Sequence, residues 1–319
     1  MAVYTQISDD GLIAFLATYD IGDLVSYAGI AEGVENSNFL LRTTTGTFIL
    51  TLYEKRVDAN DLPFFIGLMD HLARHGLSCP TPVVDRDGVA LRALAGRPAA
   101  IVTFLDGVWP RRITPPHCRE LGGALADLHL AGADFTMQRP NNLSLSGWGP
   151  LLTASGLATD QVYHGLYNLL SDELRHLALH WPADLPVGVI HADLFQDNAF
   201  FLGDKISGVI DFYFACTDFL AYDLAICLNA WCFESDGSLN VTKSRALINA
   251  YQKRRPLTPA ERAALPVLAR GAALRFLLTR LYDWLNHPKG AFVKPKDPLE
   301  YLARLRVHQR ITSASSYGG

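Results

Sequence analysis

The sequence has few of the features that would direct a chain to a membrane, to nucleic acid or to an oxidising compartment. No apolar run approaches the ~18 residues of a membrane span, because the apolar region after Val209 is cut by Asp211, Asp218 and Asp223. The net charge of −4 provides no basic footprint for nucleic acid. The five cysteines contain no Cys-x-x-Cys pair, which favours reduced thiols over disulfides or a zinc site.

Targeting and repetitive segments are not expected either. The acidic, mixed N-terminus does not resemble a signal peptide, and no internal repeat or low-complexity tract is present. Hydrophobic residues make up 49% and charged residues 19% of the 319 residues, as in ordinary globular proteins. We therefore expect a cytoplasmic protein, long enough for two domains, that binds neither membrane nor nucleic acid.

The most informative segment runs from His191 to Asn198 and reads HADLFQDN. The short apolar run at 187–190 follows a proline and predicts a buried strand. That strand would deliver His191 and Asp193 to its end, where functional loops commonly lie.

A hairpin is predicted directly after this segment. Residues 198–202 and 206–211 read as two strands around Gly203-Asp204-Lys205. With a short loop, Asn198 lies opposite Val209 or Ile210, and neighbouring strands are ~4.8 Å apart. Asn198 and Asp211 should therefore meet at the open end of the hairpin, where hard oxygen ligands suit Mg²⁺.

An Asp, an Asn five residues later and a second Asp after the next apolar run are typical of phosphoryl transfer. Asp193 would accept the proton of an attacking hydroxyl, while Asn198 and Asp211 would hold the Mg²⁺ ions that bridge the phosphates of ATP. Other interpretations exist: Asp193 could cap a turn, and Asn198 could simply start a strand. A metal hydrolase is another, with ligands drawn from His191, Asp193, Asp197 and Asp211.

The order of predicted elements changes along the chain. A β-rich first part of about 105 residues contains one helix inserted after its third strand; its expected elements are a helix at 8–19, strands at 25–32, 38–43 and 47–54, a helix at 61–74, and a hairpin formed by 89–94 and 99–105 around 96–98. The second part is mainly helical, with helices expected at 116–130, 159–179, 220–233, 242–252 and 259–285. We expect domains at 1–105 and 106–319 with a cleft between them, where ligands usually bind.

This arrangement resembles the aminoglycoside-phosphotransferase branch of the protein-kinase-like fold and, more closely, the bacterial homoserine kinases of that branch. The resemblance covers nearly the whole chain and is carried by the segments 35–39, 48–54, 62–65, 190–198, 272–276, 280–284 and 296–298. It implies a two-lobed α+β fold, with an N-terminal antiparallel sheet lobe and a larger helical C-terminal lobe. It also implies that ATP and Mg²⁺ are used to phosphorylate the hydroxyl of homoserine for threonine synthesis.

The resemblance assigns the nucleotide to two segments of the first lobe. The loop that joins the first two strands would cover the phosphates, with Gly33, Asn36, Ser37 and Asn38 as candidates, although it lacks a Gly-x-Gly-x-x-Gly pattern and could be a plain hairpin turn. Thr103 and Phe104 belong to the inter-lobe connector, whose backbone would bind the adenine.

One position departs from the general kinase pattern. Thr51 stands on the third strand where kinases usually place a phosphate-binding lysine. Lys55 lies roughly 13 Å further along an extended strand, so we interpret it as a surface residue. Asp61 and Asp70 are candidates for the acidic partner on the following helix, and both could be surface charges.

The remaining assignments concern the catalytic loop and the acceptor. We expect His191 to organise the loop through hydrogen bonds and Asp223 to anchor its backbone, unless Asp223 is simply a helix-start carboxylate. The carboxylate of homoserine requires an arginine fork, for which Arg275 and Arg280 are the candidates. An inter-helix salt-bridge network is the alternative for both.

Two rival functions remain open from the sequence. Another kinase of the same fold could act on choline, ethanolamine, methylthioribose or an aminoglycoside. A nucleotide-binding pseudokinase is supported only by the missing lysine.

Overall fold

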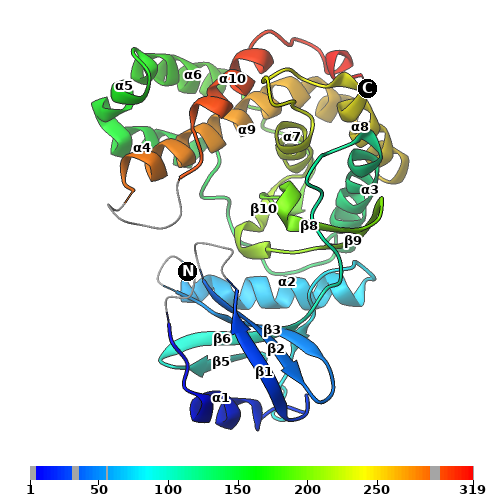
Figure 1. Cartoon of the computed structure of the whole chain (residues 1–319). Coiled ribbons are helices and arrows are strands. Elements are labelled where there is room, and N and C mark those ends of the chain that lie inside the picture. The colour runs from blue at the N-terminus through cyan, green and yellow to red at the C-terminus, as the bar shows by residue number, and fades with distance from the viewer. Residues whose placement is uncertain (1–4, 31–35, 55–56, 288–294, 319) are drawn as a thin grey trace.

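An antiparallel sheet forms the first part of the chain, drawn in blue to cyan in Figure 1. The structure is a computed structural model that describes residues 5–30, 36–54, 57–287 and 295–318. The strand order is β1-β2-β3-β6-β4, with β5 paired to β6. The strands are β1 (Leu24–Gly29), β2 (Ser37–Thr43), β3 (Thr47–Leu52), β4 (Pro82–Val83), β5 (Leu91–Leu94) and β6 (Arg97–Thr103).

The two faces of this sheet pack against different helices, because successive side chains of a strand point to opposite faces. Leu50 and Leu52 of β3 belong to a buried cluster with residues of α1 (Asp9–Leu16). Ala100 and Val102 of β6 face the larger core that includes α2 (Leu62–Arg74). Thr51, between Leu50 and Leu52, therefore lies on the face that is turned toward α2 and the second part of the chain.

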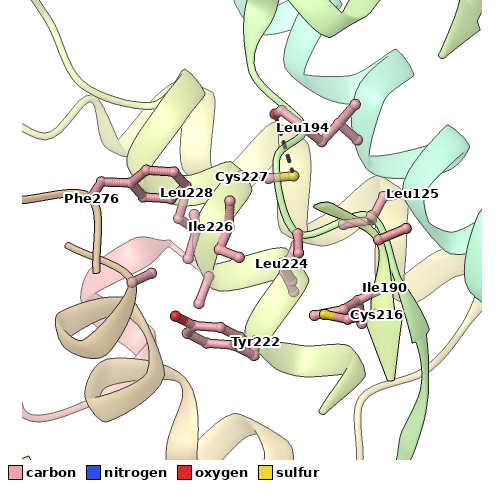
Figure 2. Packing of buried hydrophobic residues seen from close by; sticks show 14 of the residues in the cluster. Leu125, Ile190, Leu194, Cys216, Tyr222, Leu224, Ile226, Cys227, Leu228 and Phe276 are labelled. Atoms are coloured by element: carbon pink, nitrogen blue, oxygen red, sulfur yellow. Dashed lines mark hydrogen bonds between the residues drawn. The ribbon is translucent and has the colours of Figure 1, made fainter. Parts of the chain in front are cut away.

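Helices make up most of the second part, drawn in green to red in Figure 1. They are α3 (Pro115–Ala131), α4 (Leu145–Ser155), α5 (Thr159–Val162), α6 (Leu166–His180), α7 (Leu220–Trp231), α8 (Val241–Arg254), α9 (Pro259–Leu285) and α10 (Leu299–His308). The α7 helix is buried along nearly its whole length. Figure 2 shows Leu224 of α7 close to Ile190, Cys216 and Leu125, which come from the strands and from α3, whereas Cys227 of α7 lies beside Leu194 and donates to its carbonyl.

Two small antiparallel pairs carry the loops of interest. The first pairs β7 (Val187–Ile190) with β10 (Cys216–Phe219), and the second pairs β8 (Ala199–Leu202) with β9 (Lys205–Val209). The β8–β9 hairpin also holds the segment that follows β6, because Val108 and Phe201 exchange backbone hydrogen bonds of 3.0 and 2.9 Å. The hairpin is therefore fixed to the connection between the two parts.

The predicted α+β class, with an antiparallel sheet followed by a mainly helical part, is confirmed. The helix expected at 159–179 is divided into α5 and α6, because Gly165 adopts a left-handed conformation with φ +73°. The loop expected at 96–98 is a tighter turn at Ala95 and Gly96, which both have positive φ, so β6 already begins at Arg97. Helices α4 and α10 were not predicted.

The five cysteine thiols are buried and form no disulfide, as predicted. Among the described residues, no helix is both long and apolar enough to span a bilayer. The expected boundary at 105/106 falls just after β6, in the segment that leads to α3. The division into two independent domains stays a prediction.

Candidate active site

One buried carboxylate holds the backbone of the loop after β7. Asp223, near the start of α7, accepts hydrogen bonds from the backbone N–H groups of His191 (2.7 Å) and Ala192 (3.0 Å). Ala192 has φ +63°, a conformation that costs a non-glycine residue roughly 1–2 kcal/mol. The two hydrogen bonds therefore hold the loop in a shape that it would not adopt alone.

Asp223 is charged although it is fully buried. Burial raises the pKa of this carboxyl, but the hydrogen bond with His129 and the backbone N–H of His191 outweigh it and lower the pKa below its ordinary value. The Nε2 atom of His129 lies 3.2 Å from Asp223 Oδ2. A helix-start carboxylate needs no such set of partners, so this geometry favours the predicted anchoring role of Asp223.

His191 connects the loop to the end of the hairpin. Its Nε2 lies 2.9 Å from the carbonyl oxygen of Ile210 and must donate, while its Nδ1 accepts from the backbone N–H of Asp193 at 3.2 Å. Both ring nitrogens are thus used by neutral imidazole. Burial lowers the pKa of His191, which keeps it neutral. This geometry fits a residue that organises the loop and leaves no ring nitrogen for a metal.

The predicted hairpin register is confirmed. Ala199 pairs with Val209, and the N–H of Ile210 donates to the carbonyl of Asn198 over 3.0 Å. Asn198 itself ends a short 3₁₀ turn instead of starting the strand, and Asp211 leaves the strand with φ +65° and ψ +65°. Both residues nevertheless lie at the open end of the hairpin, because Asp211 directly follows Ile210, which is hydrogen-bonded to Asn198.

Asn198 also contacts Asp193 directly. Its Nδ2 donates to the backbone carbonyl of Asp193 at 2.8 Å and lies 3.4 Å from Asp193 Oδ2. The amide is thereby oriented with its oxygen away from Asp193. That oxygen and the Asp211 carboxylate are the hard donors that Mg²⁺ prefers, so the residues present fit such an ion.

The carboxyl of Asp193 is buried among other charged groups. Burial raises the pKa of its carboxyl to about 8, against the opposing charge of Arg275, and the carboxylates of Asp211 and Asp197 act in the same direction as burial. A carboxyl whose pKa lies near the operating pH is suited to accept a proton from a hydroxyl.

The described residues among those predicted to bind phosphates form hydrogen bonds with β3 and with Glu54, which follows it. Gly33 lies outside the described residues. Asn36 accepts a hydrogen bond from the N–H of Glu54 at 3.2 Å, and Ser37 donates to the Glu54 carboxylate at 2.8 Å. Asn38 accepts from the hydroxyl of Thr51 at 2.8 Å. These bonds fix the start of β2 against the end of β3.

Thr51 belongs to a network of hydroxyls and an amide at the position where kinases usually have a lysine. Besides Asn38, its hydroxyl interacts with that of Tyr213, which lies 3.2 Å from the hydroxyl of Tyr53. Burial and the charge of Asp211 raise the pKa of Tyr213 to about 12, although its hydrogen bond to Tyr53 opposes this. The network is therefore neutral and adjoins the turn that carries Asp211. Lys55 lies outside the described residues.

The connector residues have different surroundings. Thr103 is bonded to Thr81 through both its backbone N–H and its hydroxyl, each at 2.9 Å. The Phe104 side chain is 41% exposed. The backbone at Thr103 and Phe104 is thus hydrogen-bonded on one side and exposed on the other, which suits hydrogen bonds to the edge of an adenine ring.

The two arginines predicted to bind the acceptor differ from each other. Arg275 is 1% exposed, and its Nη1 donates to the carbonyl of Ala192 in the catalytic loop. Its Nε is a buried donor for which the described residues offer no acceptor. Arg280 pairs with Glu300 of α10 at 2.5 Å, which is the inter-helix salt bridge given above as the alternative.

A second charged pair near the loop was not singled out from the sequence. Lys296 Nζ lies 3.8 Å from Asp197 Oδ2, and both side chains are exposed. The Lys296 ammonium also lies 5.5 Å from the centre of the Phe195 ring. Asp197 was considered only as a metal ligand and Lys296 only as part of the segment 296–298, and the pair was missed because its partners are distant along the chain.

Known proteins resemble this chain in sequence and in structure. The model of the phosphotransferase enzyme family matches residues 26–257. The homoserine kinase of Xanthobacter autotrophicus is 66% identical over 318 residues, which span 100% of this chain and 99% of that protein.

Solved structures show the same fold at low sequence identity. The amicoumacin kinase hAmiN superposes with a TM-score of 0.72 at 14% identity, covering 96% of this chain and 95% of its own. The choline kinase of Cryptosporidium parvum gives a TM-score of 0.67 at 14% identity, with 95% of each chain covered. The predicted protein-kinase-like fold is thus confirmed, while at such identities these likenesses carry no information on the acceptor.

Proposed function

The chain belongs to the phosphotransferase enzyme family and, within it, to the homoserine kinases, and from this membership we propose that it transfers the γ-phosphoryl group of ATP to the hydroxyl of L-homoserine. The products would be ADP and O-phospho-L-homoserine. The observation that supports the acceptor is the 66% identity to a homoserine kinase along the full length of both proteins. The contact between Asp193 and Asn198 supports the chemistry.

In the proposed mechanism, Asp193 takes the proton of the attacking hydroxyl as its oxygen bonds to the γ-phosphorus and the bond to the ADP oxygen breaks. Burial of the carboxyl, which raises its pKa, would favour retention of that proton until it is released to water. Asn198 and Asp211 would hold Mg²⁺, which neutralises charge on the phosphates when bound. Because Thr51 brings no positive charge, the Mg²⁺ held by these two residues would have to neutralise more of the phosphate charge than in a kinase with a lysine.

The proposed acceptor site must recognise an ammonium and a carboxylate on one carbon. Arg275 is suited to the carboxylate, since its buried Nε still needs an acceptor. Lys296 and Asp197 place one positive and one negative side chain at the exposed side of the catalytic loop. Arg280, paired with Glu300, is proposed to hold α10 against α9 rather than to contact the acceptor.

A Mg²⁺-dependent ATP-consumption assay tests the function. We would compare homoserine, choline, methylthioribose and an aminoglycoside, and identify the phosphorylated product by mass spectrometry. We expect kcat/KM for homoserine to exceed the others by at least ~100-fold, as for sites built around charged groups. Preference for another acceptor would overturn the proposed substrate, and no ATP turnover with any acceptor would favour the pseudokinase.

A further inference from the structure

An ion pair joins the start of α2 to the helical part of the chain. Arg139 Nε lies 2.6 Å from Asp61 Oδ2, and the two side chains are 18% and 30% exposed. Asp61 occupies the N-cap position of α2, but its side chain makes no capping hydrogen bond. Its carboxylate is instead directed to an arginine that follows it by 78 residues.

Arg139 is fixed from the other side by the strand that follows the Asp211 turn. Its backbone carbonyl accepts from the N–H of Thr217 at 2.7 Å, and its N–H donates to the Thr217 hydroxyl at 3.3 Å. Its Nη1 donates to the carbonyl of Ala215 at 3.2 Å. Ala215 ends the 3₁₀ turn Phe212–Phe214, whose first flanking residue is Asp211. The guanidinium therefore holds the far end of the turn that carries Asp211.

Aromatic rings complete the same connection. The Arg139 guanidinium lies 5.1 Å from the centre of the Phe65 ring on α2. Phe65 meets Tyr213 edge to face, with ring centres 5.7 Å apart, and the Tyr213 hydroxyl lies 3.2 Å from that of Tyr53 after β3. The α2 helix, the end of β3 and the Asp211 turn thus pack as one unit around Arg139.

In kinases with the usual lysine, that lysine pairs with an acidic residue of the helix after the third strand and so couples this helix to the phosphates. Here Thr51 occupies the lysine position and cannot form such a pair. Asp70, the other acidic candidate on α2, pairs with Arg74 of the same helix on the surface. Asp61, at the start of α2, is therefore the acidic residue that connects this helix to the helical second part of the chain, through its ion pair with Arg139.

We propose that Arg139 is a positioning residue which, through Asp61 and Ala215, holds α2 and the Asp211 turn in the arrangement that binds the metal–nucleotide complex. The inference rests on the proposed role of Asp211 as a metal ligand. Arg139 contacts neither metal nor nucleotide in this scheme and acts through the backbone of the turn.

The variants Arg139→Gln, Asp61→Asn and their combination test this. We would measure the Mg²⁺ concentration for half-maximal binding of a fluorescent ATP analogue, its affinity without Mg²⁺, kcat with homoserine, and Tm. We expect each single variant to raise the Mg²⁺ concentration for half-maximal binding roughly tenfold. The double variant should need no more Mg²⁺ than the single variant with the larger effect, because the effects of contacting residues are not additive. Affinity without Mg²⁺ should stay within about twofold of wild type. Arg139→Lys, which keeps the charge, should recover part of the loss.

Arg74→Gln and Asp70→Asn are the matched controls, since they break an exposed pair on the same helix. We expect both to leave the Mg²⁺ requirement unchanged. A lower Tm for Arg139→Gln with an unchanged Mg²⁺ requirement and kcat would reduce the pair to a structural role and overturn the proposal. Nucleotide binding does not depend on the acceptor, so these outcomes stand apart from a failed homoserine assay.

Asp211→Asn provides the reference for loss of a metal ligand. If the Mg²⁺ requirement rises in Asp211→Asn but not in Arg139→Gln, the positioning role of Arg139 is overturned and the metal role of Asp211 stands. An unchanged Mg²⁺ requirement in Asp211→Asn would overturn the metal role of that residue and this proposal with it.

Discussion

The side-chain amide of Asn198 donates to the backbone carbonyl of Asp193 over 2.8 Å, so the proposed metal ligand also fixes the proposed base. The same amide nitrogen lies 3.4 Å from Asp193 Oδ2. Because the backbone carbonyl of Asn198 accepts from Ile210, the hairpin end and the catalytic loop share this residue. The proposed base and the proposed metal site therefore share one hydrogen-bonded unit.

Asp193→Asn should keep the fold and remove most of the turnover. Asparagine has nearly the same shape but cannot accept the proton, so we expect kcat to fall by about 10²–10⁴-fold, with Tm equal to or above that of wild type. Steady-state kinetics and thermal unfolding check both expectations. Asp204→Asn, at the exposed tip of the β8–β9 hairpin, is the control and should leave kcat unchanged. Near-wild-type turnover in Asp193→Asn would rule out its role as the base.

Arg275→Ala should weaken acceptor binding more than nucleotide binding. Loss of the guanidinium removes the proposed partner of the homoserine carboxylate, so we expect KM for homoserine to rise at least ~tenfold while KM for ATP changes less. Because the side chain is buried, Arg275→Lys is measured beside it to separate loss of charge from loss of packing. Arg119→Ala, an exposed residue of α3, is the control. An unchanged KM for homoserine would remove Arg275 from the acceptor site.

Asp223→Asn should destabilise the protein and slow it. The carboxylate uses one oxygen for the N–H of Ala192 and the other for the N–H of His191, whereas an amide has a single acceptor oxygen. At least one buried N–H then loses its partner, which costs about 1–3 kcal/mol. Chemical denaturation measures that loss, and kcat reports whether the loop shape of Ala192 is kept. Asp172→Asn, an exposed partner of Arg175, should change neither. Wild-type stability in Asp223→Asn would show that the two N–H groups find other acceptors.

The catalytic segment could be predicted from the sequence because its signals are local. The apolar run at β7, the turn at Gly203 and the spacing from Asp193 to Asn198 together define the hairpin and its register. Helix α4 was missed because Gly147, Gly149 and Pro150 weaken its local helix signal. Helix α10 was missed although Leu299, Leu302 and Leu305 recur at helical spacing. Their helical form depends on packing against α9 more than on local propensity.

The contacts that support the site could not be predicted in the same way. The bond from Asp223 to His191 and the pair of Asp61 with Arg139 join residues 32 and 78 positions apart. In sequence, Asp61 and Asp70 are equivalent acids on one helix. Only the three-dimensional arrangement directs the first to Arg139 and the second to solvent.

Two neighbouring glycines of α3 should respond oppositely to alanine. A Cβ at Gly122 would lie 2.2 Å from the carbonyl oxygen of Leu247 on α8, whereas at Gly123 it would meet only the guanidinium of Arg254, at 3.0 Å. Backbone cannot move aside as an exposed side chain can. We expect Gly122→Ala to lose about 1–3 kcal/mol in unfolding free energy. Gly123→Ala should be neutral or gain up to ~1 kcal/mol from helix propensity. Urea denaturation of the two variants compares them directly, and equal stabilities would contradict the close α3–α8 contact.

The stability of the helical part should fall with acid through His308. This residue is 1% exposed and neutral, bonded through Nδ1 to the Tyr317 hydroxyl at 2.8 Å and through Nε2 to Asn229 Oδ1 at 3.1 Å. Burial lowers its pKa from 6.5 to about 3. Between these pH values His308 binds a proton in the unfolded chain but not in the folded chain. The contribution of His308 to the free energy of unfolding is therefore complete above pH 6.5 and is lost as the pH falls toward 3. At pH 5 the loss amounts to about 2 kcal/mol.

His308→Gln removes this titration and should flatten the decline in unfolding free energy between pH 7.5 and 5 by about that 2 kcal/mol, even if the variant is less stable at every pH. Part of the decline should remain, because burial also lowers the pKa of His191. Urea unfolding at several pH values measures the slope. The exposed His164→Gln is the control and should keep the wild-type slope. A wild-type slope in His308→Gln would mean that His308 is hydrated or protonated in the folded chain.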